Sequence, residues 1–221
     1  ATARRRLEGL VGAFLGEKQF VGCNGLEITD EIRATIAAQA CLMLLGRGDG
    51  LYDELRSILV YPSSFWVEDE VHDEDGLVTS RRRELSGEAW DSHRIILSWE
   101  DIAETAAGAA AAGYNVVVHE FAHYLDAEGL GLADRKADPA AWRESLAAEY
   151  EAFCAAVDRD EETFLDPYAA EDEAEFFAVV TEEFFECPAD LREAHPALYG
   201  LMRAYYGTDP ASWAPAGDGI R

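Results

Sequence analysis

The sequence predicts an α+β domain in which a small mixed sheet packs on a helix that carries two histidines, followed by a helical C-terminal half. Three observations lead to this prediction. Short β-branched or aromatic runs lie between Leu55 and Trp99, bounded by Pro, Gly and Asp. From Asp101 onward the pattern is helical. An H-E-F-A-H motif begins at His119 within that helical part. Strands in one half and helices in the other are typical of the α+β class.

The length of 221 residues suits one domain, and we expect residues 1–221 to form a single unit. Its strand-containing N-terminal half extends to about residue 100, and the helical half follows it. Hydrophobic residues make up 49% of the chain and aromatic residues 11%. This composition is sufficient for a packed core and argues against disorder.

Two amphipathic helices are predicted before the strands. The first covers Arg4 to Leu15. The second follows Thr29, whose hydroxyl suits an N-cap, and ends at Gly46. Its predicted buried stripe consists of Ile32, Ile36, Ala40 and Leu44.

Three strands are predicted at Ser57–Tyr61, Ser64–Val67 and Ile95–Trp99. The acidic segment Glu68–Asp75 between them is interpreted as a solvated loop or a hairpin tip. We interpret Ile95–Trp99 as a candidate edge strand, with which an extended peptide could pair by strand addition. Any small sheet has such an edge, so this pattern is not specific to peptide binding.

Helices dominate the remainder of the chain. Beyond the H-E-F-A-H helix, we predict helices over Pro139–Val157, Glu171–Glu186 and Ala189–Tyr206, before a Gly/Pro-rich tail.

The formal net charge of −26 limits the possible partners. Nucleic acid and anionic membrane surfaces are disfavoured, because binding to either needs a positive field. A cationic partner or substrate would suit the charge, although such an excess of acid more often serves solubility. No window is long and apolar enough to be a membrane span.

The cysteine pattern indicates a reducing compartment. Cys23, Cys41, Cys154 and Cys187 are scattered and form no C-x-x-C pair, so they predict neither a disulfide framework nor a second metal site. The N-terminal Ala-Thr-Ala-Arg-Arg-Arg shows no secretory signal pattern. We therefore expect reduced thiols in a cytoplasmic protein.

The H-E-F-A-H motif is the most informative stretch. His119 and His123 are four residues apart, so on a helix both imidazoles project from one face and can reach one zinc ion. Glu120 lies beside them and could hold a water molecule. A helix with two histidines by coincidence is the alternative.

A catalytic zinc site needs a third protein ligand. The longer pattern H-E-x-x-H-x-x-G-x-x-H is absent, because Asp126 and Gly129 occupy its Gly and His positions. A carboxylate from the helix that follows Tyr168 is a better candidate. Glu175 and Glu182 share one face there, flanked by bulky apolar residues. An amphipathic helix with solvated acids is the alternative.

The chain resembles the Mlc titration factor A family of zinc metallopeptidases, whose catalytic region is similar to the anthrax lethal factor protease domain. The matching segments run in the family's order from about Phe14 to Tyr206, nearly the whole chain. They are GLEITDEIRATIAAQACLMLLG, ILVYPSSF, SGEAWDSHRIILSW, VVVHEFAHYLD and YAAEDEAEFFAVVTEEFFECP. The H-E-x-x-H motif is shared by many zinc peptidase families. The SGEAW segment and the Y-x6-E-F-F-A run make the match specific.

The resemblance implies a zincin-like fold with one Zn²⁺ per chain, bound by His119, His123 and Glu175. It implies that Glu120 is the general base and that Tyr168 donates its hydroxyl to the transition state. It further implies outer-shell roles for Asp126 and Glu182, since a ligating imidazole usually donates its second N–H to an acceptor.

Two functions follow as expectations. The first is a zinc-dependent peptidase that hydrolyses a peptide or protein substrate through a metal-activated water. The second is a binding protein that sequesters a transcriptional repressor, with a weakly active or latent zinc site. Glu120 favours the peptidase, because a structural zinc site needs no base. The absence of a recognisable specificity pocket favours the binding protein.

Overall fold

The computed structural model describes residues 2–48, 50–72, 78–85, 87–91, 93–109, 113–127, 132–133 and 137–213, with the backbone alone from 65 to 91. The N-terminal half contains α1 (Thr2–Glu17), β1 (Gln19–Gly22), α2 (Asp30–Leu42), β2 (Ser57–Tyr61), β3 (Phe65–His72), β4 (Val78–Leu85), β5 (Gly87–Asp91) and β6 (Arg94–Ser98). The C-terminal half contains α3 (Trp99–Ala106), α4 (Val116–Ala127), α5 (Pro139–Val157), the 3₁₀ turn η1 (Pro167–Ala170), α6 (Glu173–Glu186), α7 (Pro188–Ala194), α8 (Pro196–Tyr206) and η2 (Pro210–Ser212).

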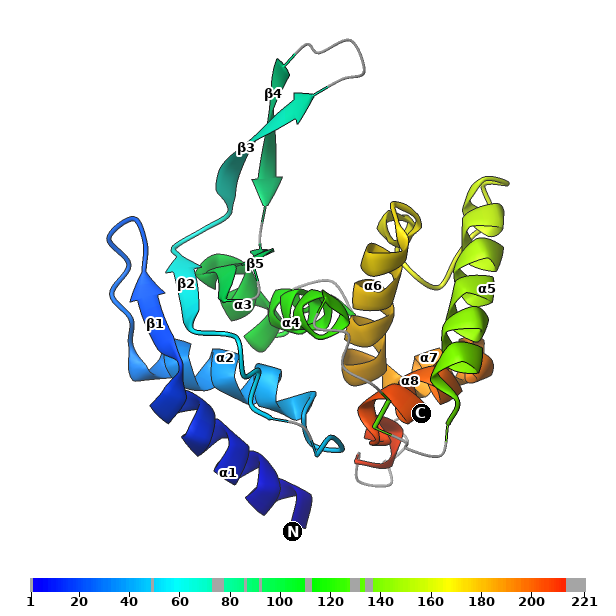
Figure 1. The fold of residues 1–221 in the computed structure, drawn as a ribbon, viewed down its shortest axis with the longest axis horizontal. Helices are drawn as coiled ribbons and strands as arrows, with labels where there is room; N and C mark the ends of the chain where they lie inside the picture. The colour runs from blue at the N-terminus through cyan, green and yellow to red at the C-terminus, as the bar shows by residue number, and fades with distance from the viewer. Residues whose placement is uncertain are drawn as a thin grey trace.

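A four-stranded mixed sheet lies in the N-terminal half, in the order β1-β2-β6-β5. Figure 1 labels three of its strands, β1, β2 and β5. β1, β2 and β6 are parallel, and β5 is antiparallel to β6. The pairs Ile58 with Ile95 and Val60 with Leu97 are buried on both strands. α4 packs against β5 and β6. The predicted α+β class, with a small mixed sheet on the histidine-bearing helix, is confirmed.

The predicted edge position of Ile95–Trp99 is wrong. β6 spans Arg94–Ser98 and pairs with β2 on one side and β5 on the other, while Trp99 begins α3. Residues 95–98 are all buried, as expected of a central strand covered on both faces. The edge next to α4 is β5 instead.

A two-stranded hairpin, β3–β4, projects from the sheet (Figure 1). Its first strand extends through His72, so residues 68–72, predicted as a solvated loop or a hairpin tip, are instead part of a strand and pair with β4. Residues 73–75 of the predicted loop lie outside the described part of the chain.

The predicted helix after Thr29 is confirmed, with a different end. The Thr29 hydroxyl accepts a hydrogen bond from the Ile32 N–H at 3.2 Å and caps α2. α2 ends at Leu42, before Gly46. Gly46 instead allows a close approach of two chain segments, because a Cβ there would lie 2.3 Å from the carbonyl oxygens of Tyr206 and Gly207. All four residues of the predicted stripe are buried, although the last of them, Leu44, lies beyond the end of α2.

The helix predicted over Pro139–Val157 is confirmed at both ends as α5. The single helix predicted over Ala189–Tyr206 is wrong, because α7 ends at Ala194 and α8 begins at Pro196. Proline has no N–H and suits the first position of a helix, so Pro196 starts a second helix rather than continuing the first.

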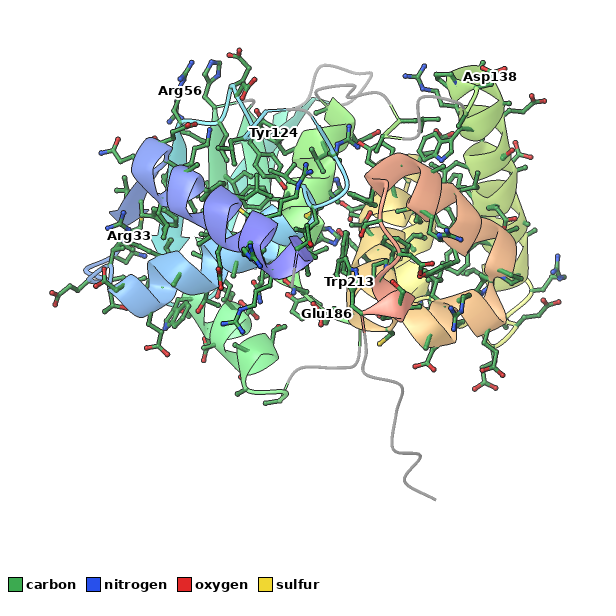
Figure 2. The ribbon with its side chains drawn as sticks, turned by 90° about the horizontal axis from the view of Figure 1, so that it is seen from below. Arg33, Arg56, Tyr124, Asp138, Glu186 and Trp213 are labelled. Carbon is green, nitrogen blue, oxygen red and sulfur yellow. The ribbon has the colours of Figure 1, made fainter. Side chains whose placement is uncertain are left out.

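Both halves contribute to one hydrophobic core cluster. The expectation that residues 1–221 form a single domain stays a prediction. Figure 2 shows the strand-bearing and helical parts side by side. α4 lies between them and packs on both α2 and α6. Its apolar face places the Phe121 ring 6.0 Å from Phe14 and 4.7 Å from Tyr52, centroid to centroid. The Tyr124 hydroxyl accepts a hydrogen bond from the Leu55 N–H.

The four cysteines all lie in described residues and carry free thiols. None of the helices in the described part of the chain is long and apolar enough to cross a lipid bilayer.

A tight turn before α4 lies against α6. Gly113 has a positive φ of 86°, which favours glycine, and a Cβ there would lie 2.1 Å from a carboxylate oxygen of Glu183. Burial raises the pKa of Glu183 to about 7, with a smaller contribution from the negative charge of Glu182 and an opposing hydrogen bond with Cys187.

Replacing this carboxyl (Glu183→Gln) should stabilise the protein above pH 7 and have little effect near pH 4. The unfolded carboxyl ionises near 4.5, whereas the folded one keeps its proton to about 7. Between these values ionisation favours the unfolded chain, so the wild type loses stability relative to the variant as the pH rises. Unfolding of both proteins between about pH 4 and pH 8 measures the difference. A difference that is independent of pH would contradict this account.

Candidate metal centre

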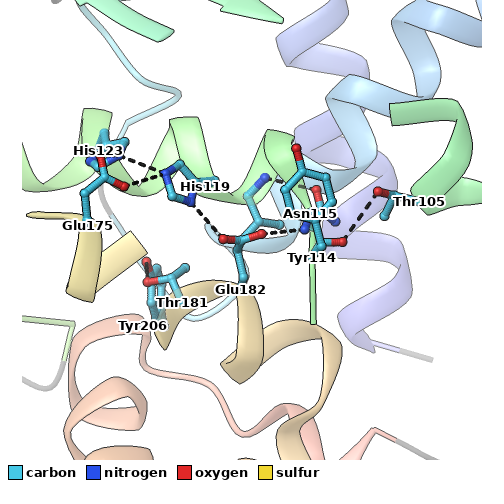
Figure 3. A network of polar contacts seen from close by, with 10 residues as sticks. Thr105, Tyr114, Asn115, His119, His123, Glu175, Thr181, Glu182 and Tyr206 are labelled. Carbon is cyan, nitrogen blue, oxygen red and sulfur yellow. Dashed lines mark hydrogen bonds and ion pairs between the residues drawn. The ribbon is translucent and has the colours of Figure 1, made fainter. Parts of the chain in front are cut away.

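Three side chains of the kinds that bind metals meet where α4 packs on α6. His119 and His123 come from one face of α4, and Glu175 comes from the first turn of α6 (Figure 3). One ligand atom from each lies within 4.8 Å of the other two. The structure therefore brings together the three residues that the sequence nominated as ligands, close enough to hold a metal ion.

The ligand atoms face one another. The Nε2 atom of His119 lies 3.0 Å from Oε2 of Glu175 and 3.1 Å from Nε2 of His123. The Nε2 atom of His123 lies 3.5 Å from Oε1 of Glu175. The three side chains are between 13% and 19% exposed, so the cluster is largely but not fully shielded from water.

The other ring nitrogen of His119 is held by Glu182. Its Nδ1 lies 2.8 Å from Oε1 of Glu182, a buried residue one helical turn from the end of α6. The second oxygen of Glu182 accepts a hydrogen bond from the backbone N–H of Asn115. With Nδ1 engaged in this way, Nε2 is the nitrogen that faces the other ligands.

Charges in the cluster are strongly coupled. Burial disfavours the charged imidazolium of His119, but hydrogen bonds with Glu175 and Glu182 outweigh it and raise the pKa of His119 to about 10. Burial also works against ionisation of Glu175, but His119 and His123 hold its pKa well below its usual range. Burial raises the pKa of Glu182, which His119 and Asn115 partly offset. A bound metal would take the place of the His119 proton.

Glu120 follows His119 on α4 and is 5% exposed. Tyr168 lies in η1, which begins where the Asp166 carboxylate accepts a hydrogen bond from the Tyr168 N–H at 2.8 Å. Its ring centroid is 6.4 Å from that of His119, and the residue is 48% exposed. Burial and the neighbouring Glu175 carboxylate raise the pKa of Tyr168, so its hydroxyl stays protonated at neutral pH.

The two residues expected in the outer shell, Glu182 and Asp126, differ in whether they contact a histidine. Glu182 is hydrogen-bonded to His119, whereas Asp126 is an exposed residue one helical turn beyond His123. Partial desolvation of its carboxyl nevertheless raises the pKa of Asp126, and the charge of His123 partly offsets this effect, so the two side chains are electrostatically coupled. A role for Asp126 in orienting His123 stays a prediction.

Asn115 is a residue of this network that the sequence reasoning missed. It directly precedes α4, and its Oδ1 accepts a hydrogen bond from the Val118 N–H at 3.1 Å. An asparagine immediately before an apolar helix is an N-cap signal that could have identified it. No pattern in the sequence predicts the hydrogen bonds that Asn115 makes to α6.

Known proteins resemble this chain over most of its length. The model of a family described as glucose-regulated metallo-peptidase M90 matches residues 1–207. An uncharacterized protein of Synechocystis sp. is 40% identical, covering 94% of this chain and 77% of the relative. The Mlc titration factor A of Pectobacterium atrosepticum is 34% identical, with 93% and 79% covered. The Mlc titration factor A of Klebsiella pneumoniae strain 342 is 36% identical, with 95% and 80% covered.

These similarities extend through the histidine-bearing helix and the helix that carries Glu175, and they agree with the resemblance carried by the sequence motifs. The chain belongs to the glucose-regulated metallo-peptidase M90 family.

Proposed function

We propose that this protein is a zinc-dependent peptidase that hydrolyses peptide bonds. The observation that carries the proposal is the meeting of two imidazoles and a carboxylate within 4.8 Å, beside the buried carboxylate of Glu120. Two histidines and a glutamate are a recurrent ligand set of catalytic zinc, which keeps a further position for water or substrate. Membership of a metallo-peptidase family supports the proposal.

In this proposal His119, His123 and Glu175 hold one zinc ion per chain. The bound zinc would lower the pKa of a water molecule and polarise the substrate carbonyl. Glu120 would take a proton from the attacking water as its oxygen bonds to the carbonyl carbon, and would deliver that proton to the amine as the C–N bond breaks. The Tyr168 hydroxyl donates a hydrogen bond to the carbonyl oxygen as negative charge grows there. Tyr168 is 48% exposed, so part of this residue faces the solvent from which a substrate would arrive.

The substrate class in this proposal is a peptide or protein. β5 is an edge strand of the sheet and contacts α4, so an extended peptide could add to this edge beside the ligands. We place the activity in the cytoplasm, where free thiols stay reduced. The charge of −26 favours neither nucleic acid nor an anionic membrane as a partner.

A second candidate function is the sequestration of a transcriptional repressor. It is favoured by relatives at about 35% identity that carry the name Mlc titration factor A. In this case the zinc site would be weakly active or latent, and a repressor would bind with or without zinc. If the wild type cleaves no peptide in a library but binds such a repressor, the binding function is favoured over the peptidase.

The purified protein should hold about one zinc ion per chain, as expected of a mononuclear site. Glu175→Ala should lose most of this zinc, because it removes one of three ligands. Glu173→Ala, which removes an exposed acid from the same helical turn, should retain it. Elemental analysis before and after reconstitution measures the content. A wild-type protein that takes up no zinc would contradict the proposed metal site.

Glu120→Gln should retain zinc and lose peptide hydrolysis by a factor of about 10² to 10⁴, because it keeps the shape of the side chain and removes the base. The assay compares cleavage of a peptide library by the wild type and the variant at equal zinc content. Equal rates would contradict the role of Glu120 and strengthen the binding function.

Tyr168→Phe should lower kcat by a factor of about 10² and change KM little, because the hydroxyl matters mainly to the developing charge on the carbonyl oxygen. The substitution retains the ring, and the residue is 48% exposed, so folding should be unaffected. Steady-state kinetics separate the two constants. A change in KM alone would assign Tyr168 to substrate binding instead.

A further inference from the structure

We propose that Asn115 is a positioning residue of the metal centre, which holds Glu182 against His119 and so fixes the orientation of that ligand. This inference rests on the proposed metal site. Asn115 is neither a candidate ligand nor one of the proposed reacting groups. It is 2% exposed, and Figure 3 shows it between the start of α4 and the side chain of Glu182.

Asn115 is bonded to both helices that build the centre. Toward α4, its backbone carbonyl accepts from the His119 N–H at 2.9 Å, and its Oδ1 accepts from the Val118 N–H at 3.1 Å. Toward α6, its backbone N–H donates to Oε2 of Glu182, and its Nδ2 donates to Oε1 of Glu186 at 2.6 Å. Asn115 therefore links the start of α4 to the C-terminal part of α6 by hydrogen bonds.

These bonds close a ring around the ligand. The backbone of His119 is bonded to Asn115, the side chain of His119 is bonded to Glu182 at 2.8 Å, and Glu182 is bonded back to Asn115. Glu182 is 4% exposed, so water cannot easily replace either bond to its carboxylate. Rotation of the imidazole would break the Nδ1 contact and turn Nε2 away from the proposed metal position.

The chemistry of this position selects asparagine. One short side chain must accept from the Val118 N–H and donate to Glu186 at the same time, which an amide can do. Aspartate would keep the acceptor, but it would lose the donor and add a negative charge beside Glu182 and Glu186. Serine would keep the acceptor and lack the reach of an amide.

An ordinary helix cap is the alternative role of Asn115. A cap accounts for the bond to Val118 but not for the two bonds to α6. Aspartate caps helices about as well as asparagine. A residue that acts only as a cap should therefore tolerate Asn115→Asp, and a positioning residue should not.

The test measures zinc affinity by competition with a chromophoric chelator, together with the visible spectrum of the cobalt-substituted protein, which reports on ligand geometry. Asn115→Asp should weaken zinc binding by about 10- to 100-fold, the usual effect of disturbing an outer-shell partner, because losing the side-chain bond to Glu186 should displace the Asn115 backbone N–H that holds Glu182. Its cobalt spectrum should change, and kcat should fall more than KM rises. Asn115→Ser should change in the same direction, and it supplies the measurement if Asn115→Asp does not fold.

A second substitution that restores the lost hydrogen bond tests whether that bond carries the effect. Adding Glu186→Gln to Asn115→Asp exchanges donor and acceptor, because the new amide can donate to the new carboxylate. This double variant should regain much of the zinc affinity and cobalt spectrum of the wild type.

Thr29→Ala is a control for loss of stability alone. It removes the cap of α2, away from the centre, and should lower the melting temperature without changing zinc affinity.

Two failures are distinguishable. A wild type that binds zinc, with Asn115 variants that match it in affinity and cobalt spectrum, would overturn the positioning role and leave the metal site intact. A loss of zinc affinity in Asn115→Asp that the double variant does not recover would show that the bond between positions 115 and 186 does not carry the effect, and would also overturn the positioning role. A wild type that binds neither zinc nor cobalt would overturn the metal site and the positioning role with it.

Discussion

The packing of α4 on α6 is the contact on which the metal centre depends. His119 and Glu175 are 56 positions apart in the chain, yet their side chains lie 3.0 Å apart because these two helices are neighbours. Phe121 anchors α4 in the hydrophobic core, because its ring packs against those of Phe14 and Tyr52. Close-packed interiors resist small displacements, so this core fixes the distance between the ligands.

The centre also concentrates negative charge in a shielded place. Glu120, Glu175 and Glu182 surround two imidazoles, and Glu120 and Glu182 are buried. Burying carboxylates is unfavourable unless each has a partner of opposite charge. In the absence of a metal, protonation of His119 supplies part of this compensation, as its raised pKa shows. A divalent cation would supply more, which is a physical reason for this cluster to favour one.

Helix ends organise the centre as much as helix faces do. α4 begins at a buried asparagine rather than at an exposed cap, and α6 places Glu175 in its first turn and Glu182 two turns later. The start of one helix is thereby bonded to the side of the other. Gly113 contributes to the same junction, because its φ of 86° favours glycine and a Cβ there would lie 2.1 Å from a carboxylate oxygen of Glu183, which would have to move.

Local patterns in the sequence determined much of this protein. The spacing of His119 and His123, the cap at Thr29 and the limits of α5 follow from helical periodicity and end signals, which act over a few residues. The break between α7 and α8 at Pro196 could also have been predicted from the sequence, since proline favours the first position of a helix. The family motifs predicted Glu175 as a ligand through resemblance, and its place beside the two histidines is compatible with that role. The tertiary structure alone decided that β6 is central and β5 is the edge, and that Asn115 reaches α6. Those features depend on contacts between distant segments, whose pairing no local pattern specifies.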